Sequence, residues 1–243
     1  MDEARAIAPF AEQQMQRWAL GVRVQKQFEP AHALDRLPQG VRPYITISRE
    51  AGAGGGEIGR RVAERLGFPC LDHQLLTYMA ERYDLPEQIL KFVDETTSGW
   101  IREVFRRWLD SRVITTDEYV MRLGELVLLA ARDASAVFVG RGVQFLLPRD
   151  RGLAIRVIAP LERRIERVMA QRKMDRQAAD AFIRETEQGR CDFIRQHFHQ
   201  DPADPGLYDA VLNVERLSHD AAVAMIVEGF GRRFGAQAGA SVA

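Results

Sequence analysis

A run of small residues at 52–56 follows a short β-branched segment and precedes a segment with the apolar spacing of a helix. Backbone N–H groups converge on a phosphate only where side chains leave room, and the first turn of a helix adds the positive end of its dipole. A glycine-rich turn between a strand and a helix meets both conditions. The predicted phosphate-binding residues are Gly52, Ala53, Gly54, Gly55, Gly56 and Glu57.

The loop departs from the phosphate-binding motif G-x-x-x-x-G-K-[ST] at three of its four fixed positions. When the last glycine of the motif is aligned with Gly54, Arg49 stands at the first glycine. Gly55 then replaces the lysine, and Gly56 replaces the hydroxyl residue that binds Mg²⁺. The loop therefore lacks its usual positive side chain. Arginines become the candidates to supply that charge, because a guanidinium offers a planar fork of donors to a phosphate.

Five short segments are predicted to be β-strands, because each is too short for a helix and is rich in apolar or β-branched residues. Segments of helical period separate them. Strands that alternate with helices indicate an α/β fold, with a parallel sheet covered by helices on both faces. The predicted strands are residues 44–48, 69–72, 136–140, 153–159 and 210–214.

Helices are predicted between the strands and near both ends of the chain. Within residues 73–133, most apolar residues recur at the spacing of a helix, which predicts several separate helices. An amphipathic helix over 3–27 precedes a linker over 28–43 that contains proline and glycine. We favour packing of this helix on the domain over binding of a partner protein or a second copy. The tail 235–243 is small, polar and predicted to be disordered. The remaining predicted helices are 56–66, 160–172, 175–199 and 218–234.

Composition excludes several classes of function. Basic and acidic residues balance at 34 each, so no net field draws the chain to nucleic acid or to a membrane. No apolar run approaches the roughly 20 residues of a membrane helix. Cys70 and Cys191, without a secretory signal, indicate reduced thiols and a cytoplasmic protein. The spacing of Cys191 with His197 and His199 fits no common zinc site, so no metal-ligating cluster is predicted.

Five blocks, in order along the chain, resemble the cytidylate kinase-like family, a branch of the P-loop nucleoside-monophosphate kinases. The segment ITISREAGAGGGEIG resembles the family's loop SREYGSGGREIA, which also lacks the lysine. The segments FPCLDHQLL, VGRG, APLERRI and YDAVLN resemble the family's IPYYDKELI, VGRG, APLEFRI and YDLCIN. The resemblance implies a three-layer P-loop NTPase fold with a five-stranded parallel sheet over residues 44–234. It also implies a helical acceptor-binding insert at 74–133 and a closing lid at 161–200.

The resemblance implies an activity: transfer of the γ-phosphoryl group of ATP, with Mg²⁺, to a nucleoside monophosphate such as CMP or dCMP, or to a related small acceptor. Residues 52–57 would hold the donor's β- and γ-phosphates. Arg49 is our choice for the missing loop charge, because it belongs to the family's SRE pattern. Arg190 falls where related kinases have Asp-x-x-Arg. We choose Arg190, and then Arg167, as lid arginines that surround the transferred group on closure.

Two residues are assigned to the acceptor. Arg141 matches the arginine of a Gly-Arg-Asp block that binds the acceptor nucleotide in cytidylate kinases. It follows a predicted strand, and ligands of doubly wound sheets bind at the carboxyl ends of strands. Asp72 also ends a predicted strand. It has two equally weighted roles: contact with the acceptor or Mg²⁺, or capping of a helix that begins at His73.

The chain departs from the family pattern at two glycines. Gly56 replaces the arginine of the family's GGRE, and Gly142 replaces the aspartate of its Gly-Arg-Asp block, which leaves selectivity for cytidine open. Because the lysine, the hydroxyl residue and the loop arginine are all absent, a second hypothesis is kept. It holds that the chain is a nucleotide-binding regulator with impaired catalysis.

Overall fold

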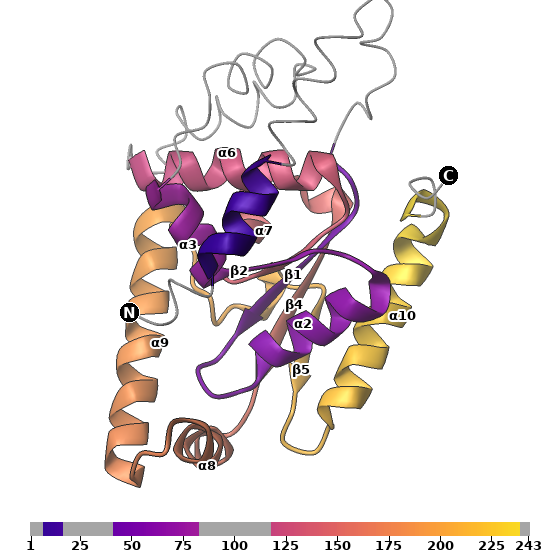
Figure 1. The fold of residues 1–243 in the computed structure, drawn as a ribbon. Helices are drawn as coiled ribbons and strands as arrows, with labels where there is room; N and C mark the ends of the chain where they lie inside the picture. Colours follow the sequence, from indigo (N-terminus) through magenta and orange to yellow (C-terminus); the bar gives the residue numbers. More distant parts are fainter. Residues whose placement is uncertain (1–6, 17–40, 83–117, 239–243) are drawn as a thin grey trace, which may run out of the picture. The chain divides into compact units, whose positions relative to one another are not determined.

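A computed structural model describes residues 7–16, 41–82 and 118–238 of the chain (Figure 1). The chain divides into two compact units. One unit comprises residues 43–72 and 135–243 and contains the sheet with every predicted site residue. The other comprises residues 1–42 and 73–134.

The sheet has five parallel strands in the order β2-β3-β1-β4-β5. Each predicted strand is present, with ends that differ from the prediction by no more than one residue. Because β1 lies between β3 and β4, the carboxyl ends of β1 and β3 meet at the same edge, and Asp72 of β2 is in register with Val139 of β3. The strands are β1 (Tyr44–Arg49), β2 (Cys70–Asp72), β3 (Val137–Val139), β4 (Gly152–Ile158) and β5 (Ala210–Asn213).

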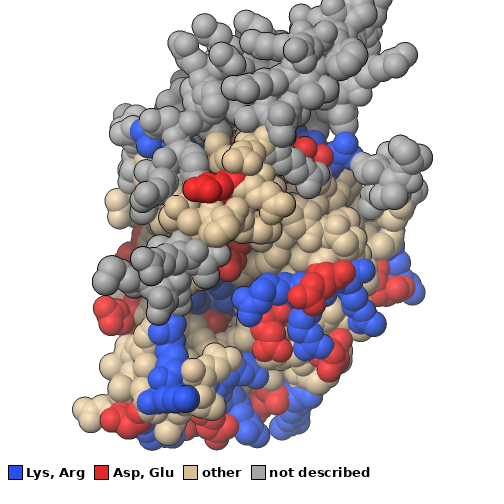
Figure 2. Space-filling model, viewed as in Figure 1, with Lys and Arg blue, Asp and Glu red and all other residues tan. Residues whose placement is uncertain are grey.

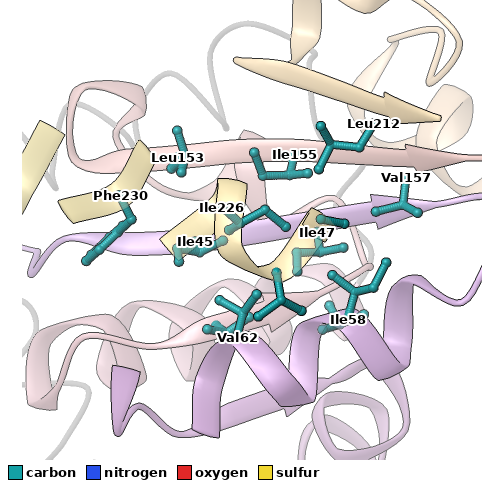
Figure 3. Packing of buried hydrophobic residues seen from close by; sticks show 14 of the residues in the cluster. Ile45, Ile47, Ile58, Val62, Leu153, Ile155, Val157, Leu212, Ile226 and Phe230 are labelled. Carbon is teal, nitrogen blue, oxygen red and sulfur yellow. The ribbon is translucent and has the colours of Figure 1, made fainter. Parts of the chain in front are cut away.

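One face of the sheet is covered by α2 (Gly55–Leu66) and α10 (His219–Ala238), which lie side by side (Figures 1 and 3). Alternate residues of a strand point to the same face, so Ile45 and Ile47 both point into this layer. There they pack with Ile58 of α2 and with Ile226 and Phe230 of α10. Burying one such side chain stabilises a fold by about 1.5–3 kcal/mol, so this cluster fixes α2 and the loop before it.

The opposite face carries Tyr44, whose hydroxyl donates to the carbonyl oxygen of Pro148 at 3.0 Å. Above it lie α7 (Val143–Leu146) and the end of α9 (Arg176–Phe198). The rings of Phe145 and Phe198 join these two helices with a centroid distance of 5.1 Å. Helices therefore cover both faces of the sheet, as predicted.

The remaining elements of this unit are α8 (Leu161–Arg172) and two short 3₁₀ helices, Arg149–Arg151 and Pro205–Leu207. The prediction of a disordered tail from 235 is wrong for its first four residues, because α10 continues to Ala238. The rings of Phe230 and Phe234 pack at 5.2 Å, and Phe234 is buried. This packing anchors the last turns of the helix. Residues 239–243 lie outside the described residues.

The second unit contains α3 (His73–Arg82), α6 (Glu118–Asp133) and a helical segment at 7–16. The hydroxyls of Thr77 and Tyr119 link α3 to α6 at 3.1 Å. Residues 83–117 of the insert predicted at 74–133 lie outside the described residues, as does most of the predicted N-terminal helix and linker.

The visible surface carries charge of both signs. Figure 2 shows basic and acidic side chains interspersed on this face, without a continuous stripe of one sign. None of the helices in the described ranges combines the length and apolarity needed to cross a membrane.

Candidate active site at the glycine loop

The glycine loop joins β1 to α2 through two residues in the left-handed region, Gly52 with φ 80° and Gly54 with φ 84°. A Cβ on Gly52 would lie 2.8 Å from the carbonyl oxygen of Arg164, which is too close for any side chain. Gly54 is the N-cap of α2 and supplies no side-chain cap. The first N–H groups of α2 therefore face the loop without a capping side chain, which is the arrangement that binds an anion.

Two carboxylates hold the start of the loop. Glu50 Oε2 accepts from the N–H of Ala159 at 3.0 Å, and Glu187 Oε1 accepts from the N–H of Ala51 at 2.6 Å. The guanidinium of Arg164 lies between them, 3.5 Å from each carboxylate. Arg164 is only 11% exposed. This paired network fixes the loop to β4, α8 and α9, and sequence reasoning did not identify it.

Arg49 ends β1 and lies beside the loop. A Cβ on Gly55 would come within 2.5 Å of the Arg49 Cβ, so the absence of a side chain at the lysine position makes room for the Arg49 stem. The guanidinium lies against Gly140 at the end of β3, where an added Cβ would overlap Nη1. Burial, then the charges of Arg190 and Arg141, lower the pKa of Arg49 to about 9, and Asp72 opposes them.

Arg190 and Arg141 complete a group with Arg49. Arg190 Nη1 donates to the carbonyl oxygen of Arg49 at 3.1 Å. Burial lowers the pKa of Arg190, and the charge of Arg141 lowers it further, while Glu187 opposes. The charge of Arg141, in the β3–α7 turn, thus acts on both Arg49 of β1 and Arg190 of α9. We call Arg49, Arg141 and Arg190 the arginine cluster.

Arg141 adopts a backbone conformation that is unusual for a residue with a side chain. Its φ is 58°, between Gly140 at 88° and Gly142 at 66°. Its guanidinium carbon lies 5.3 Å from the ring centroid of Phe193 on α9. Strained residues of this kind cost about 1–3 kcal/mol and gather at functional sites.

Asp72 lies at the end of β2, and its charge raises the pKa of both Arg49 and Cys70. Burial is the largest cause of the shift at Cys70, which reaches about 11. The carboxylate therefore belongs to the surroundings of the arginine cluster. Its two predicted roles, as a ligand or as a helix cap, stay predictions.

The position of the family's acceptor-binding aspartate is filled by apolar side chains. A Cβ on Gly142 would lie 2.5 Å from Phe198 Cε2 and 2.9 Å from Ile194 Cδ1. Because Gly142 also has a left-handed φ, an aspartate there would be strained and would collide with α9. The glycine is thus required by the packing of this chain.

Arg167, on α8, contacts the glycine run. Its Nη1 donates to the carbonyl oxygen of Gly52 at 3.1 Å. His219, which sequence reasoning missed, contacts the same stretch: a Cβ on Gly54 would lie 2.6 Å from His219 Nε2 and 2.8 Å from Arg167 Nη1. Only the position of His219 at the start of a predicted helix is visible in the sequence.

Cys191, His197 and His199 lie on α9 or at its C-cap. Over residues 7–16, 41–82 and 118–238, no three His, Cys, Asp or Glu side chains are placed to hold a metal ion. Burial raises the pKa of the Cys191 thiol, which favours the form that does not bind metal.

Comparisons with known proteins bear on the fold and the family of the chain. The chain is 30% identical over 177 residues to the cytidylate kinase of Methanopyrus kandleri, covering 72% of this chain and 86% of that protein. It is 24% identical over 210 residues to a uronate isomerase of Corynebacterium glutamicum, spanning 39% of that protein. The structure of an uncharacterized protein from Eubacterium ventriosum shares the fold with a TM-score of 0.59 at 18% identity, covering 78% of this chain and 98% of that one.

The strand order with a glycine loop between β1 and α2 confirms the predicted three-layer P-loop NTPase fold. The model of the cytidylate kinase-like family matches residues 44–216, which is most of the sheet unit together with the segment between its two parts. The chain belongs to the cytidylate kinase-like family.

Proposed function

We propose that this chain transfers the γ-phosphoryl group of ATP, with Mg²⁺, to a nucleoside monophosphate or a related small acceptor. The observation that carries the proposal is the convergence of Arg49, Arg141 and Arg190 beside an uncapped helix start. Cations that repel one another are stabilised when a polyanion binds between them. Phosphoryl transfer needs this kind of preorganised positive charge.

Each group has a role in the proposed reaction. The N–H groups at the start of α2 bind the donor's phosphates, and the left-handed Gly52 and Gly54 shape the loop around them. Arg49 and Arg190, in contact through the Arg49 carbonyl, stabilise charge on the transferred group. Arg141, held by Phe193, binds the phosphate of the acceptor. The residues position and neutralise, so no covalent enzyme intermediate is needed.

The residues present fit Mg²⁺ as a companion of the nucleotide. Mg²⁺ keeps several waters and binds mainly to substrate phosphates with one or two carboxylates. Gly56 offers no hydroxyl, and Asp72 is a carboxylate at the end of β2 whose charge acts on Arg49. Asp72 would hold the ion together with donor phosphates and water. When bound, the ion neutralises negative charge shared by the donor phosphates.

Because the chain belongs to the cytidylate kinase-like family, we propose CMP or dCMP as the acceptor, with other small phosphate-bearing acceptors as alternatives. Phe198 and Ile194 fill the place next to Gly142, so a carboxylate cannot recognise the cytosine amino group from that position. A panel of acceptors is therefore essential to the test.

A second candidate is a regulator that binds nucleotide without transferring phosphate. One observation favours it: Gly55 and Gly56 place no charged side chain in the loop, and the Arg49 guanidinium lies against Gly140. The kinase and the regulator are both expected to bind nucleotide, but only the kinase is expected to transfer phosphate.

The test is coupled phosphotransfer with ATP–Mg²⁺ and the acceptors CMP, dCMP, UMP, AMP and GMP, alongside calorimetric binding of ATP. We expect turnover with at least one acceptor and its loss in Arg141→Ala, which should weaken acceptor binding far more than ATP binding. Arg163→Ala is the matched control, because Arg163 is 62% exposed on α8 and pairs only with the nearby Glu166 in the interactions described. Binding of ATP without turnover would favour the regulator, and absence of ATP binding would reject both.

A further inference from the structure

The helix α9 is bonded to the backbone at the start of the glycine loop. Arg190 donates to the carbonyl oxygen of Arg49 at 3.1 Å. Three residues earlier on the helix, Glu187 accepts from the N–H of Ala51 at 2.6 Å. Residues three apart lie on the same side of a helix, so one side of α9 faces the loop. The far end of α9 packs on α7, so the helix is held at two places.

The helix α8 supplies two further hydrogen bonds to the same stretch of backbone. Arg164 Nη1 donates to the carbonyl oxygen of Ala51 at 3.4 Å. Arg167 Nη1 donates to the carbonyl oxygen of Gly52 at 3.1 Å. The backbone of α8 also lies so near that a Cβ on Gly52 would meet the carbonyl oxygen of Arg164 at 2.8 Å. Side chains of the two helices thus bond four backbone groups within residues 49–52.

An apolar cluster holds the same two helices against the loop. Ala51 is only 3% exposed, and it packs with buried side chains of both helices. These side chains are Ile165 and Val168 of α8 and Ala179 and Ile183 of α9. A residue of the loop therefore belongs to the core between α8 and α9. Moving the helices away from the loop would expose this core to water, which is unfavourable.

Separation would also break up the paired charges around Arg164. This side chain is 11% exposed and lies 3.5 Å from both Glu50 and Glu187. A buried charge that loses its partner is costly, because water no longer compensates it. Separating α9 from the loop would therefore cost an ion pair, hydrogen bonds and apolar contacts together.

The phosphate-binding end of the loop takes no part in the four hydrogen bonds. They all fall before Gly54, the N-cap of α2, and the first N–H groups of α2 have no side-chain cap. A phosphate can bind to these N–H groups while the four bonds stay intact. The bond from Arg190 also keeps that arginine beside Arg49, within the arginine cluster. The contacts are thus compatible with binding and with release of a ligand.

We infer that α8, α9 and residues 49–52 form one rigid body, which stays together when a phosphate-bearing ligand binds and when it leaves. The resemblance to kinases implies a lid at 161–200 that closes over the loop. In this chain the same helices are instead the support that gives the loop its shape. The inference goes beyond the proposed function, because it concerns how the loop is held and applies to any ligand of the loop.

The test measures the distance between α8 and α10 by pulsed electron spin resonance on the full chain. Spin labels are attached through Glu166→Cys and Arg232→Cys, with Cys70→Ala and Cys191→Ala to remove the native thiols. The two labelled side chains are 59% and 82% exposed and pair only within their own helices in the interactions described, so the labels leave the loop contacts intact. We expect one narrow distance distribution that is the same without ligand, with ATP–Mg²⁺ and with inorganic tripolyphosphate.

A broad distribution without ligand, or a shift to a different distance when a ligand binds, would show a lid that closes and would overturn the inference. If neither ligand binds, the proposed function fails. The width of the distribution for the protein alone then still decides between a fixed and a moving lid.

Glu187→Ala tests the contacts themselves, and Glu185→Ala is the matched control because Glu185 is exposed on the same helix. We expect Glu187→Ala to broaden the distribution and to weaken tripolyphosphate binding by about tenfold, since the loop must regain its shape on binding. Glu185→Ala should change neither quantity. Weaker binding without broadening, or an unchanged folded variant, would contradict the supporting role of α9. If Glu187→Ala does not fold, the distances in the wild-type background decide the point.

Discussion

Two groups of charges contact the glycine loop, and they are built in opposite ways. In the first, Arg164 lies between Glu50 and Glu187, and both carboxylates also accept backbone N–H groups. In the second, burial and then the charges of Arg190 and Arg141 lower the pKa of Arg49, against the charge of Asp72. Burial and the charge of Arg141 lower the pKa of Arg190, against the charge of Glu187. Paired charges hold a loop in place, whereas gathered like charges prepare for a ligand of opposite sign.

The largest expected effect belongs to the arginine cluster. Arg49→Met should lower kcat by about 10²–10³-fold, because removing one preorganised donor from a transition state costs that much. The melting temperature of the unliganded protein should not fall. The pKa of Arg49 is lowered in the folded protein, so its charge opposes folding at neutral pH and methionine relieves that cost.

The measurements are phosphotransfer rates and thermal unfolding with and without ATP–Mg²⁺. The ligand-induced rise in melting temperature should disappear in the variant. If the variant unfolds at a lower temperature but retains the wild-type kcat, Arg49 has a structural role like that of Arg164. The proposed difference between the two groups of charges would then be wrong.

The opposite behaviour is expected for the paired network. Arg164→Met leaves Glu50 and Glu187 close together without their shared cation, and it should destabilise the fold by about 2–3 kcal/mol. That corresponds to a fall of roughly 4–12 °C in melting temperature for a protein of this size. At a temperature where the variant is folded, kcat should change by less than tenfold. A loss of kcat without a loss of stability would contradict the structural role.

The sequence could predict the arginine cluster better than it could predict the paired network around Arg164. The five strands follow from short apolar runs, and the fold places the ends of β1 and β3 together. The proximity of Arg49 and Arg141 was therefore within reach. The contact between Ala51 and Glu187 joins residues 136 positions apart, and no local pattern encodes it. His219 and the apolar wall beside Gly142 depend in the same way on how α10 and α9 pack.

A pair of glycine variants separates backbone strain from displacement of Arg49. Gly140 and Gly67 both have a positive φ, but only a Cβ on Gly140 would collide with Arg49. Each alanine variant should lose about 1–2 kcal/mol of stability from backbone strain. Gly140→Ala should also lower kcat at least tenfold, whereas Gly67→Ala should leave it unchanged. Equal kcat values in the two folded variants would show that Arg49 does not need its present position.

The smallest expected effect is an increase in the affinity for ATP. A Cβ on Gly56 meets nothing within 4 Å, and its φ is not in the left-handed region, so the arginine of the family loop can be restored there without strain. Gly56→Arg should tighten ATP binding by about three- to tenfold, because it adds one partly exposed cation near the phosphates. Gly55→Lys, which restores the lysine of the P-loop motif, should weaken binding instead, since its Cβ would collide with Arg49. Calorimetry measures the affinity of both variants for ATP. Tighter ATP binding in Gly55→Lys, with no change in Gly56→Arg, would contradict this expectation. It would mean that the loop has room for the lysine of the P-loop motif and that the arginine cluster does not take over the role of that lysine.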